Sequence, residues 1–198
     1  MQKFGSDKGG WHDFDGKQGW HNYTETYEEL FASRRMEPLR VFEVGLGTNY
    51  TDVPSSMGSG GKPGASLRGW AEYFPNAQIF GADVDTRILF EEPRIKTYYV
   101  DQLKPDTIKS MWNNPELEEG FDIIIDDGLH HYSANRIFFE NSIHKLKPGG
   151  YYIVEDLIDV RHFENWGHGS RVVSLAHENN SYDNNLLIIG PLGDAVRP

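Results

Sequence analysis

Short apolar runs that stop at a glycine or an acidic residue recur along this chain, and they constrain its fold more than any other feature. The clearest run is residues 122–127, in which three isoleucines stand between aspartates. Similar runs occupy residues 39–44, 78–83, 96–100 and 151–154. Segments with helical spacing lie between them, and residues 105–112 and 133–145 are predicted to be helices. Buried strands that alternate with helices build sheets of parallel strands with helices on both faces. We therefore predict an α/β protein with a doubly wound, mostly parallel sheet.

Two later runs, residues 171–175 and 186–190, are predicted to complete the sheet. The polar connection between them is short, and short connections join antiparallel strands, so the last strand is expected to be antiparallel. Ahead of the first strand, residues 1–38 are predicted to form a lid and a helix. Residues 39–198 are predicted to form the main domain, and both parts are expected to belong to one structural domain.

The charge and composition of the chain argue against several classes of protein. Its 198 residues carry a formal net charge of −11, which repels a phosphate backbone and argues against a nucleic-acid substrate. The chain has no cysteine and no apolar run near the roughly 20 residues of a membrane span, so we expect a cytoplasmic protein without membrane contact. Residues 194–198 follow the last predicted strand closely, which favours one domain of a longer chain.

The loop after the first predicted strand has the sequence EVGLGT at residues 43–48 and contains Gly45 and Gly47. Glycine lets a backbone turn sharply and approach a ligand, and parallel α/β sheets bind ligands beyond the carboxyl ends of their strands. A plain tight turn explains this pair of glycines equally well. A nicotinamide site needs a third glycine that opens the next helix, whereas residues 51–65 here read as a long loop.

Acidic residues end the next two predicted strands: Asp83 is followed closely by Asp85, and Asp101 stands beside Gln102. A carboxylate at the first position can accept hydrogen bonds from both hydroxyls of a ribose, and the second pair can reach the edge of an adenine. In this order, with Glu43, the two glycines and the turn KPGG at residues 147–150, these residues resemble the class I S-adenosylmethionine (SAM) dependent methyltransferases. The resemblance extends from about residue 41 to residue 190.

That resemblance implies a Rossmann-like fold and SAM as the cofactor. SAM has no phosphate groups and needs no third glycine. The residues that would contact it are Glu43, Gly45, Gly47 and Thr48 at the methionine part, Asp83 at the ribose with Asp85 as the alternative, Asp101 and Gln102 at the adenine, and Asp126 as a lower-ranked candidate.

A second set of polar residues ends the two strands that follow. Asp126 and Asp127 end one of these strands, and Glu155 and Asp156 end the next. The two strands are expected to be neighbours, about 5 Å apart, so their carboxylates converge and repel one another. A divalent cation with oxygen ligands, Mg²⁺ above all, would relieve that repulsion. The alternative is that the acids cap helices or pair with Arg136 or Arg161.

The pattern Asp-Gly-x-His together with Glu-Asp is similar to metal-dependent sugar O-methyltransferases, such as those that act on macrolide sugars; related domains are also called cephalosporin hydroxylase-like. By this resemblance Asp127, Glu155 and Asp156 would hold the metal, and His130 would be the general base, with Asp127 beside it in the catalytic set. The substrate would be a sugar hydroxyl on a small molecule. Enzymes of this kind often have a longer N-terminal part through which they oligomerise, so a homo-oligomer is an open expectation.

Two N-terminal patterns also resemble this family, SDKG at residues 6–9 and the HxYxxxY spacing of residues 21–27. They would fold over the cofactor or simply pack as an arm. Two other functions stay open from the sequence. The chain could be a metal-independent methyltransferase whose acids bind a cationic substrate, or a module that binds SAM without catalysis.

Overall fold

The structure is a computed structural model that describes residues 1–9 and 19–193. The middle of the predicted lid, residues 10–18, and the chain end from which a longer protein was expected, residues 194–198, lie outside the described residues.

The described residues form one sheet of eight strands in the order β3-β4-β2-β1-β5-β6-β8-β7. The strands are β1 (Arg40–Val44), β2 (Gln78–Asp83), β3 (Glu91–Glu92), β4 (Ile95–Tyr99), β5 (Phe121–Asp126), β6 (Leu146–Val154), β7 (Arg171–Ser174) and β8 (Asn185–Ile189). The four central pairs, from β4 to β6, are parallel, whereas β3 and β8 run antiparallel to their neighbours. The mostly parallel α/β sheet with an antiparallel last strand is confirmed.

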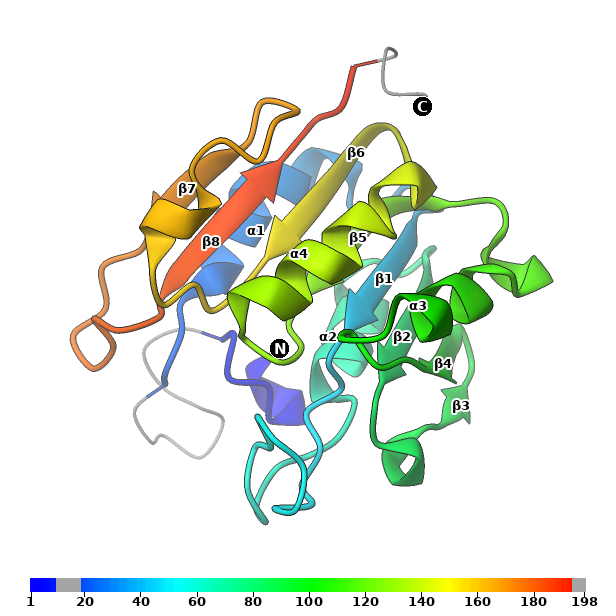
Figure 1. The fold of residues 1–198 in the computed structure, drawn as a ribbon, viewed down its shortest axis with the longest axis horizontal. Helices are drawn as coiled ribbons and strands as arrows, with labels where there is room; N and C mark the ends of the chain where they lie inside the picture. The colour runs from blue at the N-terminus through cyan, green and yellow to red at the C-terminus, as the bar shows by residue number, and fades with distance from the viewer. Residues whose placement is uncertain (10–18, 194–198) are drawn as a thin grey trace.

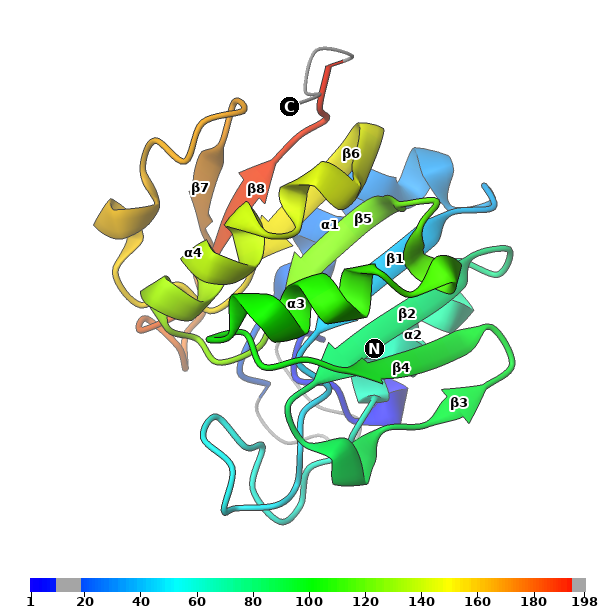
Figure 2. The same cartoon turned by 45° about the vertical axis from the view of Figure 1, so that its right-hand side comes forward.

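Helices cover both faces of this sheet, with α3 and α4 on one side and α1 and α2 on the other (Figures 1 and 2). Their bounds are α1 (Tyr23–Phe31), α2 (Ala65–Tyr73), α3 (Pro105–Trp112) and α4 (Tyr132–Glu140), and short 3₁₀ turns occur at residues 2–4, 32–34, 86–88, 115–117, 143–145 and 160–163. No helix among the described residues combines the length and apolar character that crossing a membrane requires.

Two apolar clusters, one on each face, hold the layers together. Phe42 and Ile124 belong to the cluster under α3 and α4, whereas Val41 and Ile123 belong to the cluster under α1 and α2. All four side chains are fully buried. Successive residues of a strand point to opposite faces, so a strand covered on both sides has to be apolar throughout. This is why the central strands read as continuous apolar runs rather than as alternating patterns.

Two local predictions were wrong. The KPGG segment at residues 147–150 was predicted as a turn before a strand, but β6 already begins at Leu146, and its pairing with β5 shifts register around this segment. The helix predicted over residues 133–145 ends at Glu140. The Asn141 side chain donates to the carbonyl of Ile137, and Ser142 turns inward to accept a hydrogen bond from the Trp112 ring, so the last turns cannot continue the helix.

Replacing Ile124 by alanine should lower the free energy of unfolding by about 3 kcal/mol, because it leaves a cavity in the centre of the sheet. Urea denaturation followed by circular dichroism measures this change. Ile158→Ala is the matched control, since Ile158 is 48% exposed and its loss should cost about 0.5 kcal/mol or less. Equal effects of the two substitutions would contradict this account of the core.

Candidate cofactor and metal site

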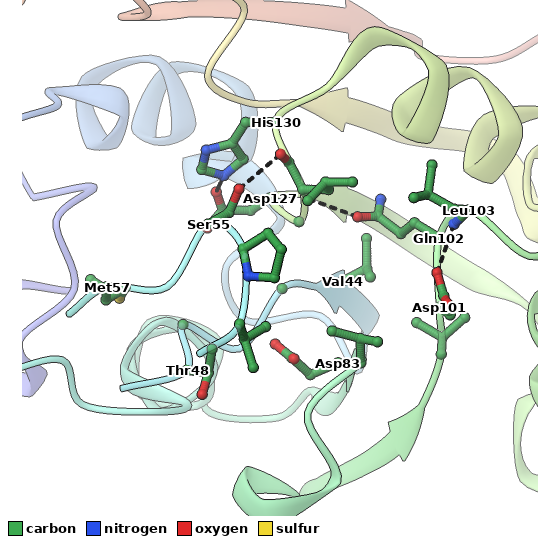
Figure 3. Close-up of a pocket in the computed structure, with 18 of the residues that line it drawn as sticks. Val44, Thr48, Ser55, Met57, Asp83, Asp101, Gln102, Leu103, Asp127 and His130 are labelled. Atoms are coloured by element: carbon green, nitrogen blue, oxygen red, sulfur yellow. Dashed lines mark hydrogen bonds and ion pairs between the residues drawn. The ribbon is translucent and has the colours of Figure 1, made fainter. Parts of the chain in front are cut away.

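A cavity opens beyond the carboxyl ends of β1, β2, β4 and β5 (Figure 3). The loop that follows β1 forms one of its walls, and Asp7 of the N-terminal segment reaches its edge. The residues of the sequence prediction that line this cavity are Gly45, Gly47, Thr48, Asp83, Asp101, Gln102, Asp127 and His130. The strand ends therefore bring most of the predicted cofactor residues to one hollow.

Asp83 holds the glycine loop against the end of β2. Its carboxylate accepts hydrogen bonds from the backbone N–H of Leu46 at 2.7 Å and of Asp85 at 2.8 Å. Burial raises the pKa of Asp83, although these backbone hydrogen bonds act in the opposite direction. The same carboxylate lines the cavity, so it shapes the loop and is also available to a ligand.

Glu43 and Asp85 were predicted as cofactor residues but do not line the cavity. The Glu43 carboxylate is fully buried and accepts hydrogen bonds from Ser66 and from the Trp70 ring on α2. Asp85 accepts hydrogen bonds from Thr48 at 2.6 Å and from Arg87 at 2.7 Å, and the bonds from Arg87 lower the pKa of Asp85 to about 2. Both acids therefore bind residues of the surrounding protein and support the cavity wall without facing the cavity.

Asp126 also lies outside the cavity lining, and Gln102 connects it to the cavity. The Gln102 amide donates to Asp126 at 2.6 Å and accepts from the backbone N–H of Leu129 at 2.8 Å, so both ends of the amide are engaged within the protein. Burial raises the pKa of Asp126 to about 6. Gln102 therefore holds in place the loop that leads from β5 to His130, in addition to any direct contact that it makes with an adenine.

The carboxylates of Asp127, Glu155 and Asp156 meet where β5 and β6 end, and we call these three residues the acidic rim. The alternative pairing with arginines is not found among the described residues, where Arg136 pairs with Glu140 and Arg161 pairs with Asp159. The two strands are neighbours, as predicted, and Asp126 lies opposite Val154 in their pairing. The rim adjoins the cavity, and Asp127 belongs to both.

Partners from the N-terminal segment surround the acidic rim. Lys8 is 1% exposed, and its ammonium donates hydrogen bonds to both Asp127 and Glu155. Tyr27 donates its hydroxyl to Glu155, and Tyr23 donates to Asp156 at 2.7 Å. Sequence reasoning found these residues only as a family resemblance, since nothing in their periodicity or spacing places them on the rim.

His21 is another residue of the N-terminal segment that contacts this region. One ring nitrogen lies 3.5 Å from a carboxylate oxygen of Asp156, and the other lies 3.2 Å from the side-chain oxygen of Asn184. The ring stacks on Tyr23 with the centroids 4.6 Å apart. The N-terminal segment is therefore joined both to the rim and to the connection that precedes β8.

His130 stands between two acids of the rim. Its Nε2 lies 3.2 Å from Asp127 and 3.3 Å from Asp156, and the residue has a left-handed backbone with φ of 55°. Burial would lower the pKa of His130, but the hydrogen bond to Asp127 and the charges of Asp156 and Asp127 raise it to about 10. The next residue, His131, is exposed and engages Ser133, so the two histidines point differently.

The rim fits a divalent cation. Asp127, His130 and Asp156 each offer a ligand atom, and these atoms all lie within 4.8 Å of one another. Burial raises the pKa of Asp156 to about 6 and that of Glu155 well above its usual range, while the charges of His130 and Lys8 act in the opposite direction. The expected ligand Glu155 is outside this triplet, since both of its oxygens are engaged by Tyr27 and Lys8.

Two sequence relatives and one solved structure are compared with the chain. It is 35% identical over 141 residues to 8-demethyl-8-alpha-L-rhamnosyl tetracenomycin-C 2'-O-methyltransferase of Streptomyces olivaceus, which covers 71% of the chain and 34% of that protein. It is 34% identical over 137 residues to demethylmacrocin O-methyltransferase of Streptomyces fradiae, covering 69% and 32%. The solved structure of MycE methyltransferase from the mycinamycin biosynthetic pathway, in complex with Mg, SAH and mycinamycin VI, matches with a TM-score of 0.59 and 28% identity, covering 78% of the chain and 35% of MycE.

In sequence and in fold the chain resembles the class I methyltransferases. Its sequence relatives are sugar O-methyltransferases, and this chain spans about a third of their length. No protein-family profile matches the sequence. The strand order and the antiparallel β8 agree with this assignment, as does the cavity at the carboxyl ends of β1, β2 and β4.

Replacing Gly45 by alanine should lower the free energy of unfolding by about 3 kcal/mol, because the added Cβ would lie 1.8 Å from the Asp127 carbonyl oxygen at a φ of +95°. Thermal and urea unfolding measure the change. Gly58→Ala is the control: its φ of +71° is also positive, but no atom lies within 4 Å, so only the backbone cost of about 1 kcal/mol remains. A Gly45→Ala variant no less stable than this control would show that the close approach carries no constraint.

Proposed function

We propose that this chain is the catalytic part of a SAM-dependent O-methyltransferase that acts on a sugar hydroxyl of a small molecule, with a divalent cation, Mg²⁺ above all, aligning the acceptor. The observation that carries this proposal is that the cavity is lined both by Asp127 of the acidic rim and by His130, which lies between Asp127 and Asp156. A methyl donor in the cavity and an acceptor oxygen on the rim would therefore meet at these two side chains. A glycosylated small molecule is the proposed acceptor because the relatives act on sugars of this kind.

The cofactor half of the proposal assigns direct contacts to the residues that line the cavity. Gly45 and Gly47 let the backbone approach the methionine part, Asp83 accepts from the ribose hydroxyls, and Asp101 lies toward the adenine. Thr48 and Gln102 also line the cavity. Glu43, Asp85 and Asp126 act through their neighbours, since their carboxylates are engaged inside the protein.

The catalytic half assigns the metal to the acidic rim and the proton to His130. Asp127 and Asp156 would hold the cation, joined by Glu155 once the oxygen that Lys8 now binds is released. When bound, the metal makes a coordinated hydroxyl more acidic, and SAM supplies an electrophilic methyl group. His130 lines the cavity and its Nε2 faces the rim. It would accept the acceptor proton in its neutral form, which is favoured when a cation on Asp127 and Asp156 offsets the charges that raise its pKa. The N-terminal segment excludes water from the acids by covering them.

A metal-independent methyltransferase is the second candidate. Lys8 favours it, because its buried ammonium already offsets part of the negative charge on the rim. The test below with a chelator separates the two candidates. We also propose that the whole protein is cytoplasmic and forms a homo-oligomer.

Asp83→Ala should weaken binding of S-adenosylhomocysteine, the product of SAM, about 100-fold, because a hydrogen-bonded carboxylate is lost from both the ligand and the glycine loop. Isothermal titration calorimetry measures the dissociation constant. Asp106→Ala removes an exposed acid from the first turn of α3, away from the cavity, and should leave it unchanged. Unaltered binding by the Asp83 variant would remove this residue from the cofactor site.

Methyl transfer from SAM to rhamnosylated polyketides or nucleotide sugars should occur with Mg²⁺ and stop after treatment with a chelator, as measured by mass spectrometry of the acceptor. His130→Ala should lower the rate about 1,000-fold through loss of the base, whereas His131→Ala should keep it. Full activity after thorough metal removal would favour the metal-independent candidate. Absence of transfer to every acceptor in the panel would count against the sugar substrate.

A further inference from the structure

Lys8 occupies an unusual position for a lysine. Its side chain is 1% exposed, and its ammonium lies between one oxygen of Asp127 and one oxygen of Glu155. Charged lysines are almost never fully buried unless they are paired, and a buried ammonium has to replace its hydration shell with acceptors. Here the two acceptors are acids of the same rim to which a divalent cation is assigned above.

The oxygens of the rim divide into two groups. Glu155 gives one oxygen to Lys8 and the other to Tyr27, while Asp127 gives one oxygen to Lys8 and directs the other toward His130. Asp156 directs one oxygen to Tyr23 and the other toward His130. A divalent cation that gathers all three acids therefore has to take an oxygen of Glu155 that Lys8 or Tyr27 now holds, and it would lie beside the Lys8 ammonium, which also contacts Asp127.

The backbone at Lys8 is held by hydrogen bonds to other parts of the chain. The carbonyl of Asp7 accepts from the backbone N–H of His21 at 3.3 Å, and the carbonyl of Lys8 accepts from Thr24 in α1 at 3.3 Å. The ammonium stands at the end of a flexible four-carbon stem with three donors. Release of the carboxylates would therefore require rotation of the side chain rather than displacement of the backbone.

We propose that Lys8 is the resident cation of the acidic rim, and that its ammonium and a divalent cation compete for the oxygens of Asp127 and Glu155. This inference rests on the metal site of the proposed function. The tethered ammonium keeps the acids together and neutralised while no metal is bound. Binding of the metal exchanges one cation for another in a preformed site, and Lys8 sets the metal affinity by the strength of its own contacts.

The decisive experiment compares Mn²⁺ binding by the full chain and its Lys8→Met variant, using isothermal titration calorimetry and the electron paramagnetic resonance of free Mn²⁺. Competition predicts about tenfold tighter binding by Lys8→Met, because the metal no longer displaces an ammonium. Lys8→Arg keeps the positive charge and should bind no more tightly than the wild type. Lys3→Met is the matched control, since it removes a lysine of the same segment that pairs with Glu72, and its affinity should be unchanged.

Thermal unfolding gives a second readout that does not depend on activity. Without metal, Lys8→Met should lose about 10 °C in Tm, because removal of one partner leaves two buried carboxylates uncompensated. Saturating Mg²⁺ should raise the Tm of this variant more than that of the wild type. Should Lys8→Met fail to fold, acetylation of Lys8 in the wild type, followed by mass spectrometry, should become faster when Mg²⁺ is added.

Equal or weaker Mn²⁺ binding by a folded Lys8→Met variant would overturn the competition, as would an acetylation rate that Mg²⁺ does not change. The outcomes also separate this inference from the proposed function. Binding by Lys8→Met but not by the wild type would support Lys8 as resident cation and exclude metal dependence of the wild type. Binding by neither protein would overturn both the competition and the metal site.

Discussion

The burial of several carboxylates at one edge of the sheet is the constraint on which the rest of the structure depends. Parallel strands share a direction, so acids that end β5 and β6 have to meet at the same edge. Carboxylates this close repel one another unless positive charge or hydrogen-bond donors lie among them. The chain supplies these donors from its N-terminal segment, through Lys8, Tyr23 and Tyr27. The same contacts therefore attach that segment to the domain and make the rim stable.

The cavity and the rim form one site because a single loop serves both. The segment from Asp127 to His130 follows β5, lines the cavity and carries two of the three side chains that could hold a metal. Gln102 engages the backbone of this loop from the cavity side, and Gly45 lies under the carbonyl of Asp127. Disturbance of the cofactor wall should therefore reach His130 through covalent and hydrogen-bonded neighbours, without a rearrangement of the sheet.

Several parts of the fold and site follow from local sequence pattern. The apolar runs predict the central strands and their burial. Residues 78–83 and 105–112 form the strand and the helix that were predicted. The errors of the sequence prediction were also local. The KPGG segment was predicted as a turn from its proline and glycines, yet it lies inside β6, because a register shift in the pairing with β5 accommodates it. The sequence of this segment alone does not reveal the shift, because the shift depends on how β6 pairs with β5.

The sequence by itself determined the α/β class and the edge at which the acids gather, because periodicity and strand direction are local properties that a single chain displays. Tertiary structure decided what each acid does. Glu43, Asp85 and Asp126 face protein donors rather than the cavity, and this depends on α2, on Arg87 and on Gln102. Lys8 is separated from its two partners by 119 and 147 residues. A contact over that distance has no local signature, since it exists only after the sheet has brought the ends of β5 and β6 beneath the N-terminal segment.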